Sequence, residues 1–202
     1  MNPPLISEQE KDGLKEICNI GASKTASYLM ENIKRKFDMN VADVTIINSE
    51  SFIKYYRTIS ERYEDPITIR NNIKGVNGNI IIASSEENMR TILNTNDKGK
   101  KLEEKIERCI SEAVKRYLRG INDFISLGAD LESTEVTYKF ADPLAYKTIK
   151  KILRLGHNGK TPKIMVNLTT LHMDEDKLLD MIMIVGIEDL DKILKSLRTL
   201  LN

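Results

Sequence analysis

The sequence contains one pattern twice, and this repeat constrains the fold more than any other feature. The segment Ala42–Thr45 reappears as Thr134–Thr137, and a long amphipathic helical pattern precedes each of them at a similar interval. Farther along, the apolar run Asn79–Ile82 corresponds to Met181–Ile184, at a slightly larger offset. A chain built from two copies of one unit most simply forms a single shared core, related by an internal axis.

Each copy predicts the same order of elements. A long helix is followed by an alternating strand, a variable middle, a buried strand and a short helix that begins at an acidic pair, Glu86-Glu87 or Glu188-Asp189. The polar, aperiodic stretch Asn94–Lys101 is the expected linker. We therefore expect the α/β (α+β) class: an internally duplicated, pseudo-twofold αβ domain with a shared central β-sheet flanked by long amphipathic helices. Residues 1–97 form the first repeat and residues 98–202 the second, as parts of one compact domain.

The variable middles of the two copies give weaker signals. Pro143–Leu155 has apolar residues at helical spacing, which predicts a helix in the second copy. Its counterpart, Phe52–Asn72, carries Tyr55, Tyr56 and Tyr63 among charged residues. That pattern leaves strand and loop equally open.

Charge and hydropathy exclude several classes of function. The 31 Lys and Arg nearly cancel the 30 Asp and Glu, for a net charge of +1, so no overall field attracts nucleic acid or an anionic membrane. The longest apolar runs, such as Leu178–Ile187, fall short of the ~20 residues of a membrane-spanning helix. The start, Met1–Pro4, lacks the basic and apolar regions of a secretory signal. We expect a soluble, cytoplasmic protein that binds neither nucleic acid nor membrane.

Cysteine and histidine are too scarce for several common kinds of active site. Cys18 and Cys109 are far apart in the sequence, and His157 and His172 are the two histidines. These four residues do not readily assemble a transition-metal site or a histidine-based triad. Each cysteine lies in an apolar helical stripe and is expected to be a small core residue, whereas His157 is expected to be exposed in a turn.

The first predicted helix has two distinct faces. Over Asp12–Met30, apolar and small residues gather on one side, which is expected to pack on a sheet. Three polar residues with i, i+4, i+7 spacing form a row on the opposite side, which we call the polar row: Asp12, Glu16 and Asn19. Ser23 and Ser27 extend the same side. Such a row either solvates the helix or acts on a molecule that docks there.

This row resembles the motif of the CheC/CheX/FliY family of chemotaxis phosphatases, which act on the phosphorylated response regulator CheY. The family motif is Asp or Ser, three residues, Glu, two residues, Asn and then, after twenty-two further residues, Pro. Asp12, Glu16 and Asn19 fill the first three places, while Ala42 stands where the family has Pro. The length, the duplication and the order of elements over roughly residues 8–195 also resemble CheC.

The second copy lacks the motif. Glu104 stands opposite Asp12, Arg108 opposite Glu16 and Ser111 opposite Asn19, while Thr134 stands opposite Ala42; the charge is reversed and the amide is absent. We therefore expect one site, on the first helix. Apolar residues still recur along the second long helix, which indicates that its structural role is retained.

The resemblance implies a role for each motif residue. Asn19 would orient the attacking water, and Glu16 would contact the active-site lysine of the response regulator; these two are the expected catalytic residues. Asp12 and Ser23 are the expected partner-binding residues, although Asp12 could equally serve the helix dipole. The protein would need no cofactor of its own, because the phosphorylated CheY-like partner supplies Mg²⁺.

Two other functions stay open at this stage. A CheC relative without hydrolytic activity would be an adaptor, for the receptor deamidase CheD or for the flagellar switch. An unrelated αβ domain with a chance motif is the third possibility. The intact pair of Glu16 and Asn19 favours the enzyme, while Ala42 and the single site favour the adaptor.

Overall fold

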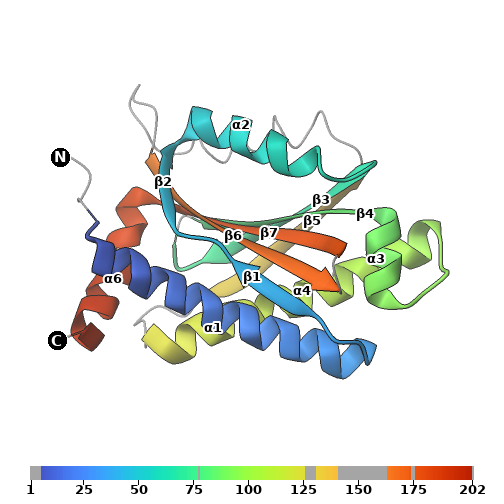
Figure 1. The fold of residues 1–202 in the computed structure, drawn as a ribbon, viewed down its shortest axis with the longest axis horizontal. Coiled ribbons are helices and arrows are strands. Elements are labelled where there is room, and N and C mark those ends of the chain that lie inside the picture. Colours follow the sequence, from blue (N-terminus) through green and yellow to red (C-terminus); the bar gives the residue numbers. More distant parts are fainter. Residues whose placement is uncertain (1–5, 77, 126–130, 141–162, 174–175, 202) are drawn as a thin grey trace.

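A seven-stranded antiparallel sheet forms the centre of the structure, with helices on both of its faces (Figure 1). The computed structural model describes residues 6–76, 78–125, 131–140, 163–173 and 176–201. The elements follow one another in this order: α1 (Glu8–Ile33), β1 (Asp38–Val41), β2 (Thr45–Asn48), α2 (Ser49–Ser60), β3 (Pro66–Lys74), β4 (Gly78–Ser85), α3 (Glu86–Leu93), α4 (Gly99–Ile125), β5 (Glu132–Phe140), β6 (Lys163–Met173), β7 (Asp176–Gly186) and α6 (Ile187–Leu201). The expected α+β class is confirmed.

The two halves of the chain meet at the middle of the sheet, where β4 pairs with β7. The strand order is β1-β6-β7-β4-β3-β5, with β2 also paired to β6. In the central pair Asn79 lies opposite Ile184, and Ile82 lies opposite Met181. This register is the one that a twofold axis between the proposed copies would produce, while the duplication itself stays a prediction.

The larger core lies between the sheet and the layer of α1, α4 and α6 (Figure 1). Leu14 and Ile17 of α1, Tyr117 of α4 and Leu194 of α6 are almost fully buried there. Cys18 and Cys109 are buried in this core as free thiols, as expected, and burial raises the pKa of each to about 11. Neither thiol is therefore a nucleophile near neutral pH.

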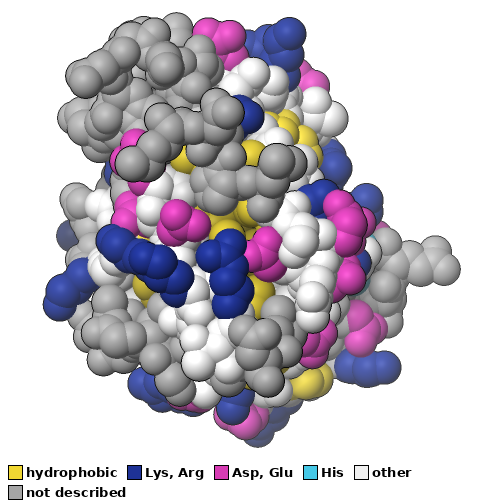
Figure 2. All heavy atoms as spheres, turned by 90° about the vertical axis from the view of Figure 1, so that its left-hand side faces the viewer, with side chains coloured by type: hydrophobic (Ala, Val, Ile, Leu, Met, Phe, Trp, Pro, Cys, Tyr) yellow, Lys and Arg dark blue, Asp and Glu magenta, His cyan; other side chains and the backbone are white. Residues whose placement is uncertain are grey.

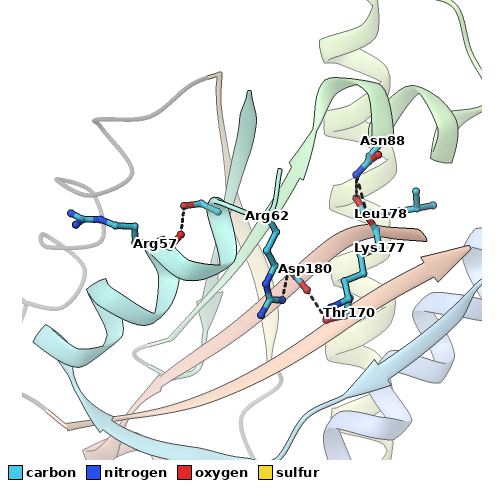
Figure 3. Close-up of polar contacts among 8 residues, drawn as sticks. Arg57, Arg62, Asn88, Thr170, Lys177, Leu178 and Asp180 are labelled. Atoms are coloured by element: carbon cyan, nitrogen blue, oxygen red, sulfur yellow. Dashed lines mark hydrogen bonds and ion pairs between the residues drawn. The ribbon is translucent and has the colours of Figure 1, made fainter. Parts of the chain in front are cut away.

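Helix α2 covers the opposite face of the sheet and is fastened there by a buried charge. Phe52 and Ile59 of α2 pack on Ile81 and Ile182. Beyond the end of the helix, Arg62 reaches Asp180 of β7, with 3.1 Å between the guanidinium and the carboxylate (Figure 3). Asp180 is fully buried and also accepts a 2.6 Å hydrogen bond from Thr170 of β6. Because an unpaired buried carboxylate is costly, this contact favours one position of α2 on the sheet.

The start of α1 is held by a capping box and by an ion pair to α6, and its end by a residue in the left-handed conformation. Ser7 and Glu10 form a capping box: the Ser7 side chain accepts from the Glu10 backbone N–H, and the Glu10 carboxylate accepts from the Ser7 backbone N–H. Glu10 also pairs with Arg198 of α6 at 2.7 Å. Lys34 ends the helix in the left-handed conformation.

Helices α1 and α4 cross in close contact because small residues lie at the crossing. A Cβ atom added at Gly21 would lie 2.9 Å from the carbonyl oxygen of Tyr117, and one added at Gly120 would lie 3.0 Å from the Gly21 Cα. Next to these glycines, the Thr25 hydroxyl donates to the Ala113 carbonyl at 3.2 Å. The crossing holds the inner face of α1 against α4 and leaves the opposite face toward solvent.

Several sequence predictions need correction. The single alternating strand predicted after the first long helix is two short strands, because residues 42–44 separate β1 from β2. Phe52–Asn72 was predicted as strand or loop. Its first part is instead most of helix α2, with Phe52, Tyr56 and Ile59 on one helical face, while its last part lies in strand β3, which confirms the strand there. The expected linker Asn94–Lys101 is shorter, since α4 begins at Gly99. The helix predicted at Pro143–Leu155, and His157, lie outside the described residues.

Replacing Gly21 with Ala tests the helix crossing. Alanine favours a helix by about 1 kcal/mol, but its Cβ would meet the backbone of α4, which cannot move without displacing the helix. We expect Gly21→Ala to lower the free energy of unfolding by about 1–3 kcal/mol in urea denaturation. Ser27→Ala, on the exposed side of the same helix, should change it by less than about 0.5 kcal/mol. Equal stability of both variants would show that α1 and α4 are not in close contact.

Replacing Glu10 with Gln tests the charge at the start of α1. The hydrogen bond from the Ser7 backbone, and then Arg198, hold the pKa of Glu10 below its ordinary value of 4.5, against the opposing effect of burial. A depressed carboxyl pKa adds stability above the unfolded pKa, and this stability is lost as the pH falls through the folded pKa. Glu10→Gln should lower the unfolding free energy at pH 7 by about 0.5–1 kcal/mol. The gap should close below pH 4.5 in urea titrations; a gap independent of pH would contradict this assignment.

Candidate functional site

The polar row lies on the solvent side of α1. Asp12 and Glu16 are exposed and Asn19 is half-buried, while Leu14, Ile17 and Cys18 on the other side of the helix are buried. The separation follows from the helical period, because residues one turn apart share a face. Asp12 lies beyond the first turn, where Glu8 and Glu10 already supply the acidic residues that favour a helix N-terminus.

Glu16 and Asn19 contact each other on this surface. The Asn19 side-chain amide donates to the Glu16 carboxylate at 3.3 Å. Both residues line a surface groove of about 340 Å³, together with Ile20, Ser23, Lys24 and Ser27. The expected catalytic pair and the expected docking residue Ser23 are therefore neighbours on a surface that the described part of the fold leaves open to solvent.

The connection between β1 and β2 is held to the sheet by both backbone groups of Ala42. The Ala42 N–H donates to the Leu168 carbonyl at 2.8 Å, and the Ala42 carbonyl accepts from the Asn167 side-chain amide at 2.8 Å. A proline at this position has no N–H and would lose the first bond. The departure from the family motif at Ala42 thus coincides with a different way of fixing the chain.

An ion pair joins this connection to α1. The Lys15 ammonium lies 2.5 Å from the carboxylate of Asp43, which directly follows Ala42. This hydrogen-bonded pairing raises the pKa of Lys15 and lowers that of Asp43. Lys15 lies beside Glu16 in the sequence, so the pair brings the connection to the edge of the polar row.

Three structures of known proteins resemble the chain over most of its length. The structure of FliY from Thermotoga maritima has a TM-score of 0.68 at 10% sequence identity, covering 97% of this chain and 99% of that one. The middle domain of FliM from Vibrio alginolyticus has a TM-score of 0.63 at 11% identity, covering 91% and 99%. FliM from H. pylori, in a complex with SpeE, has a TM-score of 0.63 at 8% identity, covering 96% and 97%.

The chain has the fold of FliY. The expected resemblance is confirmed at the level of the fold, and FliM shares that fold as well. No family model matches the sequence, and no curated protein matches it significantly. Because one fold carries different functions, the activity must be argued from the side chains of the site.

Helix α4 presents a second exposed groove, whose side chains differ in chemistry from those of the groove on α1. The predicted duplication pairs Arg108 and Ser111 of α4 with Glu16 and Asn19 of α1. Arg108 is exposed like Glu16, and Ser111 is half-buried like Asn19. Arg108 and Ser111 line a groove of about 390 Å³ with Glu104 and Glu107. Both helices thus carry a surface groove, but the groove on α4 presents a cation and a hydroxyl, and the groove on α1 a carboxylate and an amide.

The residues that surround the polar row in the structure were not predicted from the sequence. Lys15, Asp43 and Asn167 were not singled out, because their contacts join segments that are far apart in the sequence. One signal was present: Asn167 interrupts the apolar strand β6 and is only 1% exposed. A buried amide inside an apolar strand indicates a specific hydrogen-bonding partner, here Ala42.

The described residues contain neither a metal-binding cluster nor a membrane-spanning helix. In these ranges no group of three or more His, Cys, Asp or Glu side chains is arranged to hold a metal ion. None of the described helices combines the length and the apolar character needed to cross a bilayer. On the face that carries the N-terminal end of α1 and helix α6, basic and acidic side chains are interspersed (Figure 2).

Restoring the family proline tests how the connection is held. Ala42→Pro removes the N–H that donates to Leu168, so we expect the free energy of unfolding to fall by about 1–2 kcal/mol in urea denaturation. Ala42→Ser keeps the N–H and should stay within about 0.5 kcal/mol of the wild type. A proline variant as stable as the wild type would show that the hydrogen bond to Leu168 contributes nothing.

Proposed function

We propose that the chain is a CheC-type phosphatase, which hydrolyses the aspartyl phosphate of a CheY-like response regulator in chemotaxis signalling. The observation that carries the proposal is the pair formed by Glu16 and Asn19, in contact with each other on an uncovered helix face. The FliY-type fold supports it, because the pair occupies the first helix, where the family motif lies. The active site is single, on α1.

The reaction needs little from this chain beyond positioning. Water attacks phosphorus in line with the bond to the aspartyl oxygen; that bond breaks, inorganic phosphate leaves and the carboxylate of the regulator is restored. The regulator brings the Mg²⁺ that neutralises the phosphoryl oxygens. The Asn19 amide suits the remaining task, since it both donates and accepts hydrogen bonds and does not compete as a nucleophile.

The other residues of the polar row hold the two proteins in register. Glu16 meets the active-site lysine of the regulator in a charge-assisted contact, while Asp12 and Ser23 contact its surface. Both catalytic side chains stand on a helix fixed by its capping box and by α4, so little order is lost when the regulator docks. The arginine at the corresponding place of α4, Arg108, would repel the same lysine.

A second candidate is a binding protein without hydrolytic activity, for the receptor deamidase CheD or the flagellar switch. The observation in its favour is that FliM has the same fold, and FliM is found in a complex with FliG and in a complex with SpeE. The exposed groove at Arg108 and Ser111 also offers a surface that the phosphatase reaction leaves unused. This candidate predicts binding without faster loss of phosphate.

The two candidates differ in the decay of a labelled response regulator. We expect the wild-type protein to accelerate the loss of phosphate from a CheY-like regulator labelled with ³²P in the presence of Mg²⁺. Asn19→Ala should reduce this acceleration by about 10²-fold, because one water-orienting group is lost. Ser111→Ala is the matched control on α4 and should retain the wild-type rate.

Other results would reject the phosphatase. Equal decay with and without the wild-type protein would contradict hydrolysis and favour the binding protein, provided the regulator still binds. Loss of activity in Ser111→Ala together with an active Asn19→Ala would place the active site on α4 and contradict its assignment to α1.

A further inference from the structure

Lys15 occupies an unexpected place for a cation. On the helix it lies three residues after Asp12 and four before Asn19, and residues at these spacings are neighbours on a helix surface. It also directly precedes Glu16. A flexible ammonium at this position can reach the carboxylates of the polar row, where it would occupy the groups that are proposed to meet a cation of the regulator.

The structure shows Lys15 paired with Asp43. Its ammonium lies 2.5 Å from the Asp43 carboxylate, and the two side chains are 38% and 83% exposed. Asp12 adds a smaller electrostatic effect in the same direction on the pKa of Lys15, so the row is the competing partner. Asp43 thus holds this cation in an ion pair that competes with Asp12 of the polar row.

Asp43 can hold the lysine because the residue before it is anchored to the sheet. Ala42, the preceding residue, is bound through its N–H to Leu168 and through its carbonyl to Asn167, both at 2.8 Å. Asn167 is nearly fully buried, and its side-chain oxygen accepts from the Thr169 hydroxyl at 3.4 Å. The buried amide is therefore oriented with its N–H₂ toward Ala42.

We propose that Asp43 is a positioning residue, which keeps the Lys15 ammonium off the polar row so that Asp12 and Glu16 stay available to the basic side chains of the docking regulator. The inference rests on the proposed function. It assigns a role to two residues outside the family motif, and it explains how a cation is tolerated beside Glu16. The anchoring of Ala42 by Asn167 serves the same end, since it fixes the place of Asp43.

A double variant separates this role from simple stabilisation of the connection. Asp43→Asn releases Lys15, which then pairs with Asp12 or stands over the row and repels the regulator. Lys15→Gln together with Asp43→Asn breaks the same ion pair but leaves no cation. If binding only requires that no cation occupies the polar row, Lys15→Gln restores the binding that Asp43→Asn weakens. If binding requires the ion pair itself, to hold the β1–β2 connection in place, the double variant binds as weakly as Asp43→Asn.

The experiment measures binding of a CheY-like receiver loaded with Mg²⁺ and beryllofluoride, a stable mimic of the aspartyl phosphate, at low salt. We expect Asp43→Asn to raise the Kd by about three- to tenfold, and the double variant to return it to within about twofold of the wild type. The defect should shrink in 0.5 M salt, because both residues are exposed. Lys192→Gln is the matched control: it breaks another 2.5 Å ion pair, with Asp189 on α6, and should leave the Kd unchanged.

The possible failures are distinguishable. Wild-type binding in Asp43→Asn would overturn the inference and leave the proposed function standing, as would a double variant as weak as Asp43→Asn. A wild-type protein that neither binds the loaded receiver nor accelerates the loss of phosphate would overturn the proposed function and the inference together.

Discussion

The packing of α1 against α4 determines what the rest of the molecule can present. Gly21 and Gly120 let the two helices come together at distances that a methyl group would prevent, and Tyr117 fills the space beside them. Once this inner side of α1 is buried, the helical period determines which of its residues face solvent. The polar row is thus a consequence of the core: its side chains are displayed because their neighbours on the helix are hidden.

Local patterns in the sequence were sufficient for the elements that are bounded by local chemistry. The faces of α1, the central strands β4 and β7, and the helices that begin at the acidic pairs all follow from periodicity and capping. The residues of the polar row were also predictable, since one helix carries all of them. Helix α2 was missed although Phe52, Tyr56 and Ile59 have helical spacing, because charged residues and a further tyrosine stand between them.

The surroundings of the site depend on contacts that no local pattern contains. Asn167 approaches Ala42 because β6 of the second half lies beside β1 and β2 of the first, and Lys15 meets Asp43 because the chain turns back along α1. From the sequence alone, alanine at position 42 in place of the family proline indicates a weakened motif. The structure shows instead a backbone held at both its N–H and its carbonyl, which is a different means of restricting the same segment.

The exchange of strands between the two halves has a consequence for how the protein is made. Strands β1 and β2 pair with β6, and β4 pairs with β7 as well as with β3. The strands of the first half therefore leave the ribosome before their partners in the second half have been translated. Until those strands emerge, the nascent chain carries open hydrogen-bonding edges next to the apolar residues of β4. The strands of the first half therefore keep these edges unpaired until β6 and β7 have been translated.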